Sequence, residues 1–366
     1  MKRIPSLDGL RAVAIAMVCL SHFAQTKGSP LHNFSSFGNL GVRVFFVISG
    51  YLITQLLLEE RQRTGRISLK RFYFRRTLRI FPAMWFYMAV ILALNLGGVI
   101  GLASHDWWRA FTYTVNYDRQ RSWYIGHLWS LSVEEQFYLI WPFALWFGGQ
   151  RRATKLAILA VVAGPILRLA SLLTWPDAPI LEWFPTTCDA IATGCILALI
   201  PAVRLRQWTA SWIASPWVGL VPLLAIFINS LQFHVDRRYM ILFSTAGLTV
   251  MNLCIALTIY RFIVYYRDFS GRVLNSGFLV WLGTISYSLY LWQQPFLNHD
   301  VSSWVTRFPV NLIAALAMAA VSYYCVERPL LAARKRVTWL RESPTPRLFP
   351  AAGVKHRLET QPTEAS

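Results

Sequence analysis

The sequence predicts an all-α polytopic membrane protein, a bundle of about ten transmembrane helices with both termini in the cytoplasm. Of the 366 residues, 55% are hydrophobic and only 14% are charged, whereas soluble domains carry about 25% charged residues. Apolar stretches of about 20 residues, enough to cross a bilayer, follow one another along most of the chain. Basic residues gather in the short segments between these stretches, as in other polytopic membrane proteins.

The expected spans follow from the apolar stretches. They cover residues 8–25, 37–58, 80–101, 127–148, 155–174, 186–202, 212–231, 240–262, 278–298 and 308–326. The first is expected to be a retained helix, because Asp8, Arg11 and His22 interrupt it and it shows no small-residue cleavage site of a signal peptide. Residues 1–336 are expected to form one transmembrane domain. Residues 337–366 are poor in apolar side chains and are expected to be a disordered cytoplasmic tail.

The basic residues set the expected orientation. With the N-terminus inside and the spans alternating, most of the 36 lysines and arginines fall in cytoplasmic segments, as the positive-inside rule requires. The outer loops hold Lys27, Arg109, Arg119, Arg121, Arg237, Arg238 and Arg307. The net charge of +19 therefore indicates membrane orientation rather than nucleic-acid binding.

The sequence lacks the residue spacing of a cysteine metal site and the internal repeat expected of inverted-repeat transporters. The five cysteines lie in apolar stretches, and none has the CxxC or Cys/His spacing of a metal site, so we interpret them as buried thiols. We expect no bound metal and no disulfide framework. The chain also shows no clear internal repeat of the kind that inverted-repeat transporters have.

Ionisable groups inside a span are costly and therefore mark functional candidates. Arg11 and His22 are eleven residues apart, which places them on one helix face, about 16 Å apart along the axis. One face would then carry a cation at the inner mouth and an imidazole near the outer mouth. The structural alternative is an arginine that snorkels to the headgroups and a histidine bonded within a packed interior.

A basic segment between Lys70 and Pro82 alternates arginines with aromatic residues. Arg76 and Arg79 would be neighbours on one face if this segment is helical. Together with Arg75 they are candidates for phosphate recognition, because guanidinium groups bind phosphate in a bidentate manner. The alternative is a patch for anionic lipids that fixes the topology.

The fourth span opens with polar residues that packing does not explain well. Glu134 and Glu135 lie in an apolar run, and the expected topology places Glu134 at a depth like that of His22. A carboxylate that orients an imidazole is a standard general base. Near the C-terminus, Glu327 either belongs to the site or forms a local ion pair with Arg328.

Taken together, these segments resemble the acyltransferase-3 family of bacterial integral membrane O-acyltransferases, over about residues 4–330. The residues that carry the resemblance are Leu7-Asp8-Gly9-Leu10-Arg11 with His22, the run Phe45–Ile53, Arg76-x-x-Arg79 with Ile80 and Pro82, Trp129-Ser130-Leu131 with Glu134 and Phe137-Tyr138, Ser286-Tyr287 with Leu289-Tyr290-Leu291, and Glu327 with Pro329. One position departs from the family pattern, which often has histidine where this chain has Gln293.

The resemblance implies transfer of an acyl group, usually acetyl from acetyl-CoA, to a sugar hydroxyl of a cell-surface or lipid-linked glycan such as lipopolysaccharide or exopolysaccharide, at the bacterial inner membrane. It implies that Arg11 and His22 are essential and that Arg76 and Arg79 are associated with the donor. Acetyl-CoA would be a substrate, and no cofactor would be bound permanently. The tail is too short for a fused hydrolase-like domain, so a stand-alone member is expected.

We therefore expect His22 to act as the general base, with Arg11 and Glu134 completing the catalytic group. Arg75, Arg76 and Arg79 would bind the donor. The acceptor would contact Trp129, Ser130, Glu135, Tyr287 and Glu327. Two alternatives stay open: a glycan transporter or export partner without acyl transfer, and a transferase for succinyl or longer acyl groups.

Overall fold

The computed structural model describes residues 4–25, 31, 34–209, 211–213, 215–230, 241–301 and 303–334. All regular elements in these residues are helical, so the predicted all-α class is confirmed. The longer helices are α1 (Pro5–Ala24), α2 (Phe37–Thr64), α3 (Leu69–Leu96), α6 (Leu128–Thr174), α7 (Phe184–Leu199), α9 (Val221–Ser230), α11 (Leu248–Val264), α14 (Ser286–Phe296) and α15 (Val310–Val321). The predicted tail, residues 337–366, lies outside the described residues.

Short helical elements connect or extend these helices. They are α4 (Ser104–Phe111), η2 (Val115–Tyr117), α5 (Trp123–Gly126), α8 (Ala202–Thr209), η3 (Pro216–Leu220), η5 (Phe243–Gly247), α12 (Phe269–Leu274), α13 (Gly277–Thr284), η6 (Trp304–Thr306), η7 (Ser322–Glu327) and α16 (Arg328–Arg334).

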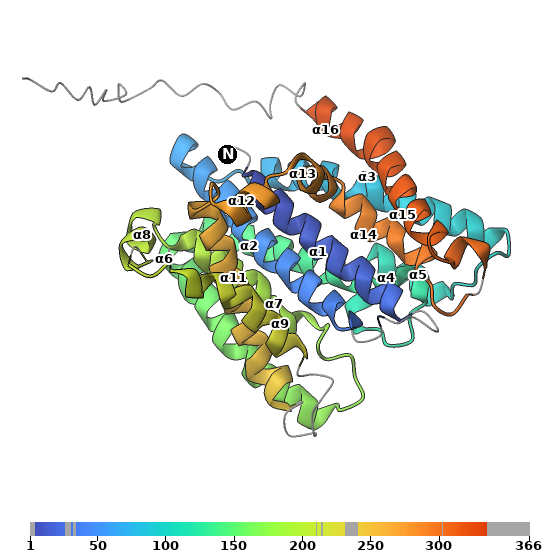
Figure 1. The fold of residues 1–366 in the computed structure, drawn as a ribbon, viewed down its shortest axis with the longest axis horizontal. Coiled ribbons are helices and arrows are strands. Elements are labelled where there is room, and N and C mark those ends of the chain that lie inside the picture. The colour runs from blue at the N-terminus through green and yellow to red at the C-terminus, as the bar shows by residue number, and fades with distance from the viewer. Residues whose placement is uncertain are drawn as a thin grey trace, which may run out of the picture.

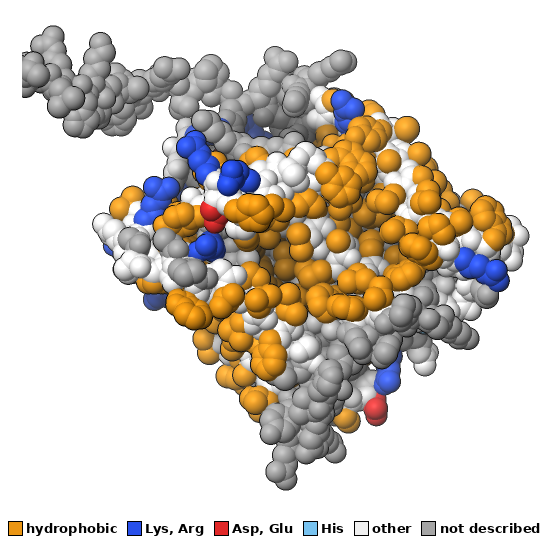
Figure 2. Space-filling model, in the orientation of Figure 1, with side chains coloured by type: hydrophobic (Ala, Val, Ile, Leu, Met, Phe, Trp, Pro, Cys, Tyr) orange, Lys and Arg blue, Asp and Glu red, His pale blue; other side chains and the backbone are white. Residues whose placement is uncertain are grey.

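The helices meet around α1 and α2. These two run side by side through the middle of the molecule, with α7, α9 and α11 on one side and α3, α14 and α15 on the other (Figure 1). Figure 2 shows that hydrophobic side chains cover most of this face, while the visible Lys and Arg side chains lie at its margins. Such a surface matches a lipid environment, because lipid tails do not penalise exposed apolar side chains.

Within the described residues, six helices are long and apolar enough to cross a membrane, or seven if α7 and α8 form one span bent by 95°. The predicted total of ten crossings and the cytoplasmic position of both termini stay predictions. One span of this difference lies in α6, which is counted once although two spans were predicted there. At 47 residues it would be about 70 Å long, more than twice the thickness of the hydrocarbon core.

A backbone break divides α6 into two parts. Gly149 has φ 62° and ψ −178°, far from helical values. Only glycine adopts positive φ at low cost. The break falls between the predicted spans 127–148 and 155–174, so each of these spans corresponds to one helical part of α6.

Helices α2 and α7 approach closely at two glycines. A Cβ atom on Gly50 would lie 1.9 Å from the carbonyl oxygen of Ile191, and one on Gly194 would lie 2.0 Å from the carbonyl oxygen of Val47. Small residues permit this approach of helix backbones in membranes. Gly50 and Gly194 therefore set the close packing of α2 against α7.

Replacing Gly50 with alanine is expected to destabilise the protein by about 1–3 kcal/mol, because the new methyl group forces α2 and α7 apart. Thermal unfolding of the detergent-solubilised protein measures the effect. Gly219→Ala is the matched control, since no atom lies within 4 Å of a Cβ placed there. Equal unfolding midpoints for the two variants would contradict this account of the α2–α7 contact.

Two arginines within the helices, Arg43 and Arg168, belong to a buried polar network. Nη1 of Arg168 donates to Oδ2 of Asp189 over 2.9 Å, and both side chains are fully buried. Nη1 of Arg43 donates to Oδ1 of Asn252 over 3.2 Å, and Nδ2 of Asn252 donates to the same Asp189 oxygen over 3.2 Å. This network joins α2, α6, α7 and α11 deep in the bundle.

Candidate active site

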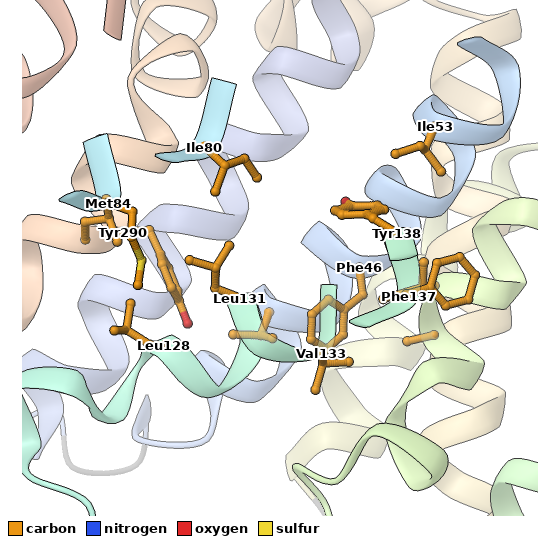
Figure 3. Packing of buried hydrophobic residues seen from close by; sticks show 14 of the residues in the cluster. Phe46, Ile53, Ile80, Met84, Leu128, Leu131, Val133, Phe137, Tyr138 and Tyr290 are labelled. Atoms are coloured by element: carbon orange, nitrogen blue, oxygen red, sulfur yellow. The ribbon is translucent and has the colours of Figure 1, made fainter. Parts of the chain in front are cut away.

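A cavity of about 710 Å³ lies among α1, α2, α3, α6 and α14. Figure 3 shows part of its apolar wall, with Ile80, Leu131 and Tyr290 on one side and Phe46, Ile53 and Tyr138 on the other. Its charged lining residues are Asp8, Arg11, Arg75, Arg76, Arg79, Glu134 and Glu327. Most of the residues predicted for the site therefore meet in one place, although they come from helices far apart in the sequence.

Arg76 lies at the centre of an ionic cluster in this wall. Its Nη2 lies 3.3 Å from Oε2 of Glu134, and its Nε lies 3.4 Å from Oε1 of Glu135. Its guanidinium group stacks 3.8 Å from the centre of the Tyr138 ring, and the Tyr138 hydroxyl donates to Glu134 over 3.2 Å. The Arg76 charge is thus balanced inside the protein, which leaves little of it for a donor phosphate.

The basic segment that contains Arg76 is helical. Helix α3 begins at Leu69, capped by the Ser68 side chain, and continues through Pro82. The helix thus begins before residue 80, where the predicted span starts, and carries the basic segment on its first turns. The expected placement of Arg76 and Arg79 on one helix face is confirmed, since both line the cavity.

Arg11 and Arg79 differ from Arg76 in having no partner. Among the described residues, neither makes a hydrogen bond or an ion pair, although both line the cavity. The two arginines repel each other, while the carboxylates of Asp8, Glu327 and Glu134 attract Arg11, and Glu327 also attracts Arg79. The pair is a candidate anion site, because an anion between the two guanidinium groups would offset their mutual repulsion.

Arg75 is already paired. Its Nη2 lies 2.9 Å from Oε2 of the buried Glu60, on α2. It still lines the cavity mouth beside Arg79. Of the three arginines predicted to bind the donor, only Arg79 is therefore free of partners within the described part of the chain.

His22 lies beyond this cavity and has a different partner from the one predicted. Its Nδ1 lies 2.6 Å from Oε1 of Gln293, and its ring contacts the Trp123 ring, with 5.3 Å between centroids. Glu134 is instead bonded to Arg76 and Tyr138. The prediction that Glu134 orients His22 is therefore wrong. Equal depth on two helices does not place two side chains on facing sides, and Glu134 points toward the cavity.

The comparison with known proteins now decides the family. Residues 4–327 match the family described as Acyltransferase domain. The chain belongs to this family. It is 30% identical to the O-acetyltransferase OatA of Staphylococcus aureus, over 89% of this chain and 57% of the relative. It is 27% identical to the peptidoglycan O-acetyltransferase OatA of Listeria monocytogenes, over 90% of this chain and 56% of the relative.

This acyltransferase domain thus spans a little over half of the length of the curated relatives that it matches. No solved structure matches it. Its family and its apolar helices make it a multi-pass membrane protein, as predicted.

Helix α14 connects the cavity of the acyltransferase domain with His22. The Tyr290 side chain lines the cavity, and its hydroxyl lies 2.6 Å from Oγ of Ser130 and donates to the carbonyl oxygen of His127 over 2.8 Å. Gln293, one helical turn further along, bonds to His22. Tyr290 therefore stands on the cavity side of α14 and Gln293 on the His22 side.

The remaining predicted site residues divide between the cavity and the core. Ser130 and Tyr287 line the cavity, and the Tyr287 hydroxyl donates to the carbonyl oxygen of Ile80 over 2.9 Å. Trp129 does not line it, and packs edge-on against Phe46 with 6.0 Å between centroids. The expected acceptor contact of Trp129 thus has no geometric support, because its ring is used in the core.

Glu327 lines the cavity and accepts a hydrogen bond of 3.2 Å from Oγ of Ser288. Arg328 instead lies over the Tyr324 ring, at 5.6 Å. The alternative of a Glu327–Arg328 ion pair is therefore wrong. All five cysteines are free, as expected, but Cys325 is exposed rather than buried.

One group of potential metal ligands lies away from the cavity, around α4. Side-chain atoms of His105, Asp106 and Asp118 fall within 4.8 Å of one another. Asp118 is paired with Nε of Arg109 at 3.1 Å, and Asp106 accepts from the backbone of Ala103 at the start of α4. These contacts account for the two carboxylates without a metal ion.

Two contacts that complete the site were not predicted. Ser49 hydrogen-bonds to Tyr138 and lines the cavity. Tyr138 follows Glu134 by four residues, a spacing that places the two on one helix face, so this contact had a signal in the sequence. The contact between His22 and Gln293 had no such signal, because 271 residues separate them.

Proposed function

We propose that this domain transfers an acetyl group from cytoplasmic acetyl-CoA to a hydroxyl of a cell-surface or lipid-linked glycan. The observation that carries the proposal is the pair of unpartnered guanidinium groups, Arg11 and Arg79, on the wall of the 710 Å³ cavity. The names of the relatives support O-acetyl transfer, and the Listeria relative favours peptidoglycan over lipopolysaccharide as the acceptor.

The cavity suits a thioester donor with an anionic end. The phosphates of CoA would lie near Arg79 and Arg11, because arginine binds phosphate through two parallel hydrogen bonds. The apolar wall around Phe46, Ile53 and Leu131 would take the pantetheine arm. The acetyl end would then reach Tyr290, on the helix that also holds Gln293 against His22.

His22 would provide the base. The acceptor hydroxyl gives its proton to the imidazole, its oxygen bonds to the thioester carbonyl carbon, and the carbon–sulfur bond breaks. The departing CoA thiolate then takes up the proton from His22, which returns the imidazole to its starting state. General-base catalysis of this kind contributes about 10²–10⁴-fold in rate.

Donor binding and donor turnover by the purified protein in detergent test the proposal. We expect Arg79→Met to weaken acetyl-CoA binding by about 10–100-fold. We expect His22→Ala to keep donor affinity but to lower acetyl transfer or donor exchange by at least about 100-fold. Arg66→Ala is the control, because Arg66 is exposed before α3 and does not line the cavity.

Absence of acetyl-CoA binding by the folded wild-type protein would overturn the proposal and favour the glycan transporter. Normal acceptor modification by His22→Ala would remove His22 from the mechanism. Equal losses of donor affinity in Arg79→Met and Arg66→Ala would show that the effect is not specific to the cavity.

A further inference from the structure

We infer that Gln293 is a positioning residue that fixes the tautomer of His22, with the proton on Nδ1 and the free electron pair on Nε2. The inference rests on the proposed function, because it assigns the atom of His22 that takes the proton. It depends on a chain of hydrogen bonds whose direction is set at one end by a backbone carbonyl group.

The chain begins at Trp123. The carbonyl oxygen of Trp123 can only accept a hydrogen bond. The Gln294 side-chain atom 2.7 Å from it is therefore the amide nitrogen Nε2, which donates. Oε1 of Gln294 then lies 3.0 Å from Gln293, which must present its own Nε2 there. Nε2 of Gln293 also points to the carbonyl oxygen of Tyr290, at 3.5 Å. Both contacts orient the Gln293 amide in the same way.

This orientation leaves Oε1 of Gln293 against Nδ1 of His22, at 2.6 Å. An amide oxygen can only accept, so Nδ1 carries the proton. A neutral imidazole has one N–H group, so Nε2 is unprotonated and can take a proton from a hydroxyl. Among the described residues, Nε2 of His22 makes no hydrogen bond, which leaves it open to a substrate.

The position of Gln293 is rigid enough for this role. Its side chain is fully buried on α14. The indole Nε1 of Trp123 donates to the carbonyl oxygen of Gln294 over 2.8 Å, which ties α5 to α14, and the Trp123 ring packs against His22. The imidazole is therefore held on one edge by a hydrogen bond and on one face by an aromatic ring.

In many enzymes the histidine that acts as a general base is hydrogen-bonded to an Asp or Glu carboxylate. Gln293 takes this place here and carries no charge. Its amide oxygen holds the tautomer but stabilises the protonated imidazole less than a carboxylate would. The other titratable groups that act on His22 are His299 and His127. His299 is itself paired with Asp300, with 2.9 Å between Nδ1 and Oδ1. No described carboxylate is bonded to His22, so its proton affinity depends on the residue at position 293.

Gln293→Glu and Gln293→Leu test the inference. In Gln293→Glu, a carboxylate replaces the amide beside Nδ1 and favours protonated His22, so we expect the acid limb of the kcat–pH profile to move up by about one pH unit or more. In Gln293→Leu, the tautomer is no longer held, so we expect kcat to fall by about 10-fold or more with little change in KM for the donor. Gln25→Glu is the control, since it places a carboxylate near the end of α1 at a residue whose side chain bonds to Ser21 and not to the His22 imidazole.

A second measurement makes the test independent of turnover. The pH dependence of His22 carbethoxylation by diethyl pyrocarbonate, followed by mass spectrometry, reports its protonation in the folded protein. We expect the midpoint to rise in Gln293→Glu and to stay near the wild-type value in Gln25→Glu. An unchanged midpoint in folded Gln293→Glu would overturn the inference. If the midpoint shifts in Gln293→Glu but the wild-type protein transfers no acetyl group, the proposed function is overturned and the role of Gln293 in holding His22 is not.

Discussion

Replacing Arg168 with methionine is expected to destabilise the protein by about 3–5 kcal/mol, because the change leaves a buried carboxylate without its ion-pair partner. Arg168 and Asp189 are fully buried, and 2.9 Å separates Nη1 from Oδ2. The variant also loses the bonds from Arg168 to the carbonyl oxygens of Thr186 and Thr245. The unfolding midpoint of the detergent-solubilised protein measures the effect.

Two further variants make this prediction specific. Arg151→Met changes an exposed arginine on the same helix and is expected to alter stability by less than about 0.5 kcal/mol. Adding Asp189→Asn to Arg168→Met is expected to recover part of the loss, because it removes the unpaired charge. If Arg168→Met melts at the same temperature as Arg151→Met, the buried pair does not stabilise this bundle.

The second large effect is expected at Arg76, in contrast to Arg79 one helical turn away. Arg76→Met leaves the partly buried Glu134 and Glu135 without the cation that contacts both of them, and we expect a loss of up to about 3 kcal/mol. Arg79→Met removes a cation that has no partner in the described residues, so we expect stability within about 1 kcal/mol of wild type. The same substitution therefore separates an arginine that stabilises the fold from one that we propose binds the donor.

Unfolding midpoints and acetyl-CoA affinity should be measured together for these two variants. We expect Arg76→Met to lower the unfolding midpoint. We expect the double variant Arg76→Met/Glu135→Gln to recover part of this loss, because it removes one of the two carboxylate charges that Arg76 no longer balances. We expect Arg79→Met to melt normally but to bind donor poorly. Similar stability losses in both variants would contradict the assignment of the Glu134–Arg76–Glu135 cluster.

The sequence alone determined the helical membrane class of the chain and most of the residues that line the cavity. Apolar runs predicted the helices, and the two parts of α6 agree with two predicted spans because the glycine break lies between them. The motif around Arg11 and that around Arg76 each place their residues on one helix face, since helical periodicity is a local property. Most residues predicted for the site accordingly line one cavity.

Only the tertiary structure decided which of these residues are partners. Glu134 bonds to Arg76 instead of His22, and His22 bonds to Gln293. These contacts depend on the rotation and tilt of each helix about its own axis, which depth along the sequence does not specify. Side-chain packing between helices sets rotation and tilt, through contacts such as the α2–α7 approach at Gly50. For that reason the sequence determines which groups are present, and the packing of the bundle determines which of them meet.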